Sequence, residues 1–128
     1  MTSFISAMTL VVPDYDEAIS FYVNVLGFEL LEDVKLGAKK RWVKVAPVGA
    51  QTAILLALAE GNAQSDAIGN QTGGRVSFFL QTDDFEGDHE RFVAKGARFL
   101  EMPRKEPYGI VAVFSDPFGN LWDLIEPN

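Results

Sequence analysis

Few side chains in this 128-residue sequence are suited to acid–base, nucleophilic or metal chemistry. There is one histidine, His89, and no cysteine, so thiolate catalysis, disulfides and sulfur-ligated metals are excluded. His89 falls on the apolar stripe of an expected helix, where we interpret it as a packing residue. No Gly-x-Ser-x-Gly sequence is present, and Gly73-Gly74 lacks the spacing of a phosphate-binding loop. The sequence therefore gives no support to nucleophilic catalysis or to a phosphate-binding loop.

The charge balance narrows the classes of partner. A net charge of −7 would repel a nucleic-acid backbone, and the basic cluster Lys39-Lys40-Arg41 is too small to compensate. A cationic small molecule would suit this acidity, although most carboxylates lie at the starts of two expected helices, where they complement the helix dipole. No apolar run is long enough to span a bilayer. We therefore expect no nucleic-acid or membrane partner, and a cytoplasmic location is the default because no secretory leader is evident.

Apolar periodicity predicts the same order of elements twice along the chain. The first half has an expected helix over 14–26 and expected strands over 4–12, 28–34, 41–46 and 52–59. The second half has an expected helix over 84–95 and expected strands over 75–82, 97–101, 109–115 and 121–125. The polar residues 60–74 between them are interpreted as a linker, or as a lid folded over a groove. The pattern predicts an α+β fold in a single domain, 1–128, with βαβββ modules at 1–59 and 75–128.

Several short motifs occur in a family-like order and spacing: Val12-Pro13-Asp14-Tyr15-Asp16-Glu17-Ala18, Leu26-Gly27-Phe28, Glu106-Pro107-Tyr108-Gly109 and Asp116-Pro117-Phe118-Gly119-Asn120. Together they resemble the vicinal-oxygen-chelate superfamily, which includes glyoxalase I, extradiol dioxygenases and bleomycin-resistance proteins. The resemblance covers essentially the whole chain and implies a cleft between two curved mixed sheets. It also implies a homodimer, with modules paired either within or between chains.

Enzymes of this family hold one divalent metal through ligands on the first and last strands of each module. Counting from the motifs places those four positions on Ala7, Ala53, Ser77 and Asp123. One carboxylate cannot supply the three or four ligands that such metals need, and a one-residue slip brings in no further histidine or carboxylate. We therefore expect no cofactor, the alternative being one divalent metal ion.

Strand alternation places the remaining polar and aromatic candidates along the expected cleft. The predicted ligand-binding residues are Thr9, Arg41, Ser77, Phe79, Gln81, Tyr108 and Asp123. A buried Asp123 needs a donor such as Arg41, a cationic ligand, or a proton. Arg41 could instead lie at the surface beside Lys39 and Lys40. Tyr108 either closes one end of the cleft or anchors its own loop.

These residues lead to one functional hypothesis and two alternatives. The hypothesis is metal-free binding or sequestration of a small molecule in the groove between the modules, with no catalytic residue assigned. The first alternative is a metal-dependent lyase or dioxygenase of the glyoxalase or extradiol kind, with a metal recruited through Asp123. The second is a dimerisation or regulatory module without a ligand.

Overall fold

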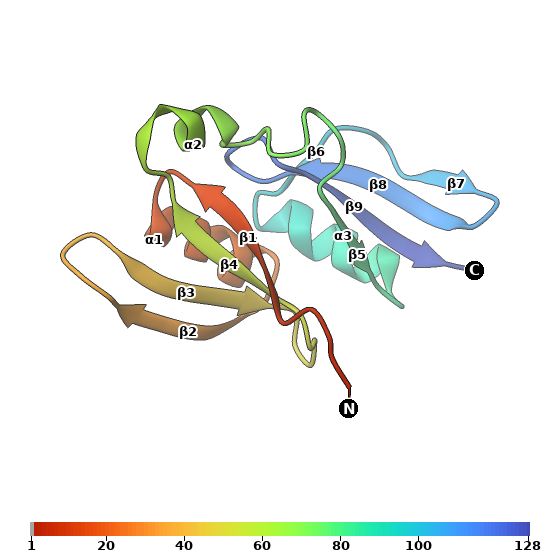
Figure 1. Ribbon diagram of the computed structural model, residues 1–128. Coiled ribbons are helices and arrows are strands. Elements are labelled where there is room, and N and C mark those ends of the chain that lie inside the picture. The colour runs from red at the N-terminus through yellow and green to blue at the C-terminus, as the bar shows by residue number, and fades with distance from the viewer. Residues whose placement is uncertain (1) are drawn as a thin grey trace. The chain divides into compact units, whose positions relative to one another are not determined.

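The computed structural model describes residues 2–128, which divide into two compact units (Figure 1). The first unit runs to Ile68 and the second from Gly69 to Asn128. Each unit contains a mixed sheet whose first and last strands are parallel neighbours, and each has a helix after its first strand. The predicted α+β fold with two βαβββ modules is confirmed.

The sheet of the first unit has the strand order β1-β4-β3-β2. Its strands are β1 (Ala7–Val12), β2 (Glu29–Lys35), β3 (Arg41–Ala46) and β4 (Ala53–Leu58). Alternate residues of β1, β3 and β4 are almost fully buried, including Leu10, Val43 and Leu56. These three residues share one face, because Leu56 is paired with both Leu10 and Val43. The core of the first unit therefore lies on this face.

The expected first helix is divided into α1 (Tyr15–Ile19) and the π-helical segment η1 (Ser20–Val25). The Oδ2 atom of Asp14 accepts a hydrogen bond from the backbone N–H of Glu17 at 2.7 Å, which caps the start of α1. The π-helical turn is wider than an α-helical one: the N–H of Leu26 donates to the carbonyl of Phe21, five residues earlier, at 3.1 Å. Tyr15, Ala18, Phe21 and Tyr22 are the buried residues of this double segment.

Part of the expected linker is helical. Helix α2 (Gly61–Ala67) begins where the Gln64 side chain accepts a hydrogen bond from the Glu60 backbone N–H at 2.8 Å. No α2 residue is buried. Its sequence, GNAQSDA, has no apolar stripe, which is the pattern that would have predicted a helix.

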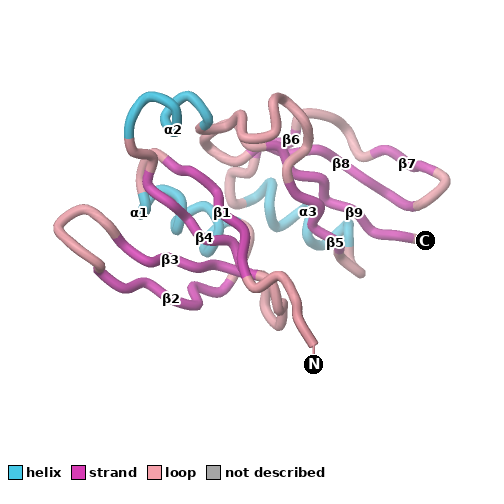
Figure 2. Tube along the Cα trace, viewed as in Figure 1, coloured by secondary structure: helices cyan, strands magenta, loops and turns pink. Residues whose placement is uncertain are grey.

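The sheet of the second unit has the order β5-β9-β8-β6, and β7 pairs separately with β8 (Figure 2). The strands are β5 (Phe78–Gln81), β6 (Arg98–Phe99), β7 (Arg104–Glu106), β8 (Gly109–Ser115) and β9 (Leu121–Pro127). The strand expected over 97–101 is therefore shorter, and β7 was not predicted. Pro103 lies between β6 and β7, and a proline has no N–H to donate to a ladder.

Helix α3 (Phe85–Ala94) covers one face of this second sheet. The Oδ1 atom of Asp84 caps it by accepting a hydrogen bond from the Gly87 N–H at 3.1 Å. Phe92 packs on Phe114 with ring centroids 5.8 Å apart, and Phe114 stacks on Trp122 at 5.9 Å. Burying each of these side chains contributes roughly 1.5–3 kcal/mol, so the aromatic cluster forms the main core of the second unit.

The turn between β8 and β9 is held by a buried carboxylate. Asp116 Oδ1 accepts hydrogen bonds from the N–H groups of Phe118 and Asn120 at 2.9 and 2.8 Å, and Oδ2 accepts one from Asn120 Nδ2 at 2.7 Å. The hairpin expected here is present. Among residues 2–128, none of the helices has the length and apolar character needed to cross a membrane.

Candidate functional site

The face of the first sheet that points away from α1 is only partly covered. Thr9 is paired with Leu55, and Leu55 is paired with Lys44, so the alternation places all three side chains on this face. Trp42 follows on the same face and keeps 39% of its surface exposed. An exposed indole beside aliphatic residues offers a flat surface on which a planar molecule can stack.

A cavity of about 270 Å³ lies against this part of the first unit. Apolar side chains from β3 and β4 form much of its wall, and α2 and the residue preceding it contribute polar groups. The lining residues include Thr9, Tyr15, Arg41, Trp42, Leu55, Ala57, Glu60 and Gln64. Mostly apolar walls with a few polar groups are typical of small-molecule sites.

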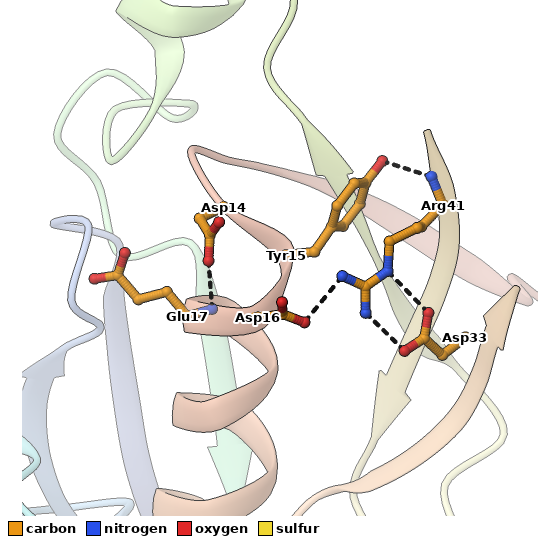
Figure 3. Close-up of polar contacts among 6 residues, drawn as sticks. All are labelled: Asp14, Tyr15, Asp16, Glu17, Asp33 and Arg41. Carbon is orange, nitrogen blue, oxygen red and sulfur yellow. Dashed lines mark hydrogen bonds and ion pairs between the residues drawn. The ribbon is translucent and has the colours of Figure 1, made fainter. Parts of the chain in front are cut away.

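Arg41 lines the cavity. Its side chain is held by Asp16 and Asp33 and lies beside Tyr15 (Figure 3). Its guanidinium contacts both oxygens of Asp33, with Nε to Oδ1 at 3.1 Å and Nη2 to Oδ2 at 2.7 Å. Nη1 donates to Asp16 Oδ1 at 2.9 Å, and the guanidinium carbon lies 5.1 Å from the centroid of the Tyr15 ring. The backbone N–H of Arg41 donates to the Tyr15 hydroxyl at 3.1 Å. The cluster therefore joins α1 to the β2–β3 hairpin.

The sequence left open whether Arg41 pairs with Asp123 or lies at the surface, and its contacts show that it is bound to two other carboxylates. Within residues 2–128, all the side-chain hydrogen bonds of Arg41 go to Asp16 and Asp33. Hydrogen bonding to Arg41 lowers the pKa of Asp33, and the two carboxylates raise the pKa of Arg41. The guanidinium remains charged and is already paired, so we assign Arg41 to the support of the cavity wall.

The two metal-ligand positions of the first unit are adjacent but chemically inert. Ala7 on β1 is paired directly with Ala53 on β4. Two methyl groups therefore stand where a pair of ligands would need nitrogen or oxygen donors.

The register of the second unit shows which β5 residue stands opposite Asp123. Asp123 on β9 is paired with Phe79 on β5 and with Val113 on β8. Ser77 precedes β5, and its N–H donates to the carbonyl of Leu121 at 2.8 Å. By analogy with the Ala7–Ala53 pair, the position opposite Asp123 is Phe79, two residues beyond Ser77. Neither a phenyl ring nor the hydroxyl of serine replaces a histidine as a metal ligand.

Asp123 is half-buried on the sheet face opposite α3, and its Oδ1 atom is buried without a hydrogen-bond partner in the part of the chain described. Burial raises the pKa of Asp123; the charge of Arg104 opposes this shift and that of Glu101 adds to it. Burial therefore makes the ionised form of this carboxyl group less favourable than it would be in water.

An ion cluster that the sequence analysis missed lies near Asp123. Arg104 Nε donates to Glu101 Oε2 at 2.9 Å, and Nη1 pairs with Glu106. Glu101 Oε2 also accepts the N–H of Val113, the residue paired with Asp123, at 3.1 Å. In the sequence, the only indication of this cluster is that Arg104 and Glu106 are two residues apart. That spacing places both side chains on one face only if the segment is a strand, as β7 is.

The remaining predicted residues of the second unit occupy different places. Phe79 is 67% exposed. Gln81 lies two residues further along β5, so it shares the face of Phe79, and it is paired with Ile125. Tyr108 lies in the β7–β8 turn, where its carbonyl accepts the N–H of Asn128 at 3.1 Å. The structure thus brings Phe79, Gln81 and Asp123 onto one face, whereas Tyr108 lies just before β8, five residues before Val113, the β8 partner of Asp123.

The donor set does not fit a divalent metal. Of the four positions implied by the resemblance, only Asp123 offers a charged ligand. In the range 2–128 the structure contains no group of three or more histidine, aspartate or glutamate side chains arranged to hold a metal ion. No chemical step is therefore assigned to a metal here.

Comparisons with known proteins agree over nearly the full chain. The family model described as the Glyoxalase/Bleomycin resistance protein/Dioxygenase superfamily matches residues 4–124. An uncharacterised protein of Shewanella frigidimarina (strain NCIMB 400) is 51% identical over 130 residues, covering 100% of this chain and 96% of its own. The crystal structure of UcmS2 superposes with a TM-score of 0.84 at 29% identity and 98% coverage of both chains. TnmS3, an antibiotic binding protein from Streptomyces sp. CB03234, gives 0.80 at 33% identity, covering 99% of this chain and 98% of its own.

Proposed function

Because the chain belongs to the glyoxalase/bleomycin resistance protein/dioxygenase superfamily, we propose that it binds and sequesters a small organic molecule without a metal. The observation that carries this proposal is the cavity of about 270 Å³ in the first unit. The similarity to TnmS3, which is an antibiotic binding protein, supports the same class of ligand.

The walls of the cavity favour a planar, largely apolar ligand. Trp42 offers its exposed ring, and Leu55 and Ala57 offer aliphatic surface. Each aromatic stacking contact of this kind contributes about 0.5–1.5 kcal/mol beyond the burial of apolar area. Thr9 and Gln64 supply polar groups that can orient the ligand.

The second unit supplies further candidate contacts on its own open sheet face. Phe79 and Gln81 are exposed there, and Asp123 lies between Phe79 and Val113 in the ladder. We propose that these residues recognise polar or cationic groups of a ligand. Arg104 is engaged by Glu101 and Glu106, which leaves the face with more carboxylates than bases.

The direct test is titration of the purified protein with two antibiotics, bleomycin and daunorubicin, by calorimetry and by fluorescence. Stacking on Trp42 is expected to quench its emission, and the Trp42→Phe variant should lose that response. Ala57→Phe, which fills the cavity, should weaken binding at least tenfold. The matched control Ala63→Leu changes an exposed residue of α2 and should leave the affinity unchanged.

Two results would count against this proposal. One is the absence of heat and of quenching with both antibiotics. The other is near-stoichiometric divalent metal in protein purified without chelators, which would direct attention to the lyase or dioxygenase alternative.

We further propose that the protein forms a homodimer and acts in the cytoplasm. Support for self-association comes from β2, an edge strand whose residues are all exposed and include Leu30, Leu31 and Val34. Light scattering after size-exclusion chromatography tests the dimer, and a mass of one chain would contradict it. Cell fractionation tests the location.

A further inference from the structure

We infer that the second unit carries a separate binding site for a compact, neutral aromatic molecule, between α3 and the β7–β8 hairpin. This inference does not depend on the function proposed above, because every residue in it belongs to the second unit and none lines the cavity beside Trp42.

The site is a cavity of about 260 Å³ with mainly apolar walls. Its lining residues are Phe85, Glu86, His89, Pro103, Lys105 and Ile110. The fold explains why space remains there. Ile110 lies on the same face of β8 as Phe114, but Phe92 of α3 covers Phe114, and Ile110 at the other end of β8 stays half-exposed.

One wall of the cavity is aromatic and ends in an unpaired polar group. The His89 ring is stacked on Phe85 with centroids 5.7 Å apart and lies 4.2 Å from Phe99. Within residues 2–128 the His89 imidazole has ring contacts but no hydrogen bond. An imidazole always carries an N–H donor, so it can bind the oxygen of a hydroxyl group while the ligand ring packs on Phe85. An aromatic alcohol or phenol therefore matches this wall.

The charges at the rim select a neutral ligand. Glu86 and Lys105 are both exposed, and neither belongs to an ion pair in the described part of the chain. Their charges are opposite, so an anionic or cationic ligand would be attracted by one and repelled by the other. The volume is also suitable, because an apolar cavity of roughly 150 Å³ takes up benzene, and about 260 Å³ leaves room for a substituent.

The test uses His89 as its own reporter, since it is the only histidine of the chain. The protein is titrated with benzyl alcohol, benzoate and benzylammonium, and the imidazole carbon–proton correlation is followed by NMR. Benzyl alcohol should give a saturable shift and a nuclear Overhauser effect between its ring and His89, with an affinity at least threefold above that of either charged probe. No saturable shift, or an equal response to all three probes, would overturn the inference.

Two variants locate the site independently. Ile110→Phe fills the cavity and should abolish the shift caused by benzyl alcohol. Lys105→Glu, at an exposed position that should not affect folding, leaves two negative charges at the rim and should make benzylammonium the preferred probe. Lys39→Glu makes the same change of net charge in the first unit and should not alter the preference.

If Ile110→Phe does not fold, an unchanged preference in Lys105→Glu still refutes the site. The readout for the first-unit cavity is Trp42, so a failure at either site is distinguishable from a failure at the other.

Discussion

Arg41 and Asp33 form a two-point ion pair that joins neighbouring strands of the first unit (Figure 3). Their side chains are 22% and 30% exposed, so water screens the pair only in part. Tyr15 lies against the same guanidinium and also accepts the backbone N–H of Arg41. Since Tyr15 and Arg41 both line the cavity, this pair supports the shape of the binding site as well as the fold.

Replacement of Arg41 by lysine should destabilise the protein by about 1 kcal/mol. Lysine keeps the charge but cannot contact both oxygens of Asp33 or stack its head group flat on Tyr15. Urea unfolding followed by circular dichroism measures the change. Lys40→Ala removes the exposed neighbouring charge and should stay within about 0.5 kcal/mol of the wild type. Equal effects of the two substitutions would contradict the role given to the ion pair.

Asp33→Asn should cost stability at neutral pH and little in acid. Arg41 lowers the pKa of Asp33 in the folded protein below the ordinary value of 3.8. For a carboxyl group of lowered pKa, the stabilisation is complete above the unfolded value and is lost as the pH falls through the folded value. The difference in unfolding free energy between wild type and Asp33→Asn should therefore shrink below pH 3.8. A difference that stays constant from pH 7 to pH 3 would show that the ion pair is not its source.

Asp123→Asn should increase stability at neutral pH, whereas Asp33→Asn should decrease it. Burial raises the pKa of Asp123 above 3.8, so ionisation opposes folding, and this cost develops as the pH rises above the unfolded value. The asparagine variant should be more stable than the wild type at pH 7 and lose that advantage near pH 3. Thermal unfolding at the two pH values measures this. Asp66→Asn, on the exposed surface of α2, is the matched control and should show neither effect.

Gly69→Ala should destabilise the second unit strongly. Gly69 has a φ of +72°, and a Cβ atom there would lie 2.0 Å from the carbonyl oxygen of Phe118. Gly49 has a similar φ of +81° but open space around it. Gly49→Ala should therefore lower the free energy of unfolding only by the cost of a Cβ atom at positive φ, about 1–2 kcal/mol. Urea unfolding of both variants separates the two causes. If the two costs are equal, the contact between Gly69 and the β8–β9 turn is unimportant.

The positions of most elements, and the small number of side chains that could bind a metal, could be predicted from the sequence. Strand and helix periodicity is local, so a short stretch such as 109–115 already predicts β8. Ala7 and Ala53 cannot ligate a metal in any fold, because their side chains have no donor atoms. The ligand-binding roles of Thr9 and Gln81 stay predictions, since location on an open face does not show what binds there.

Tertiary structure alone decided which side chains meet. Arg41 contacts Tyr15, which is 26 residues away, and Phe79 rather than Ser77 stands opposite Asp123 because of the register between β5 and β9. The missed strand β7 is three residues long and is held by its pairing with β8, not by its own periodicity. These features depend on strand register and on contacts between distant segments, and a one-residue shift in register moves every side chain to the other face. Residue types thus determined which chemistry is possible, and long-range pairing determined where it is assembled.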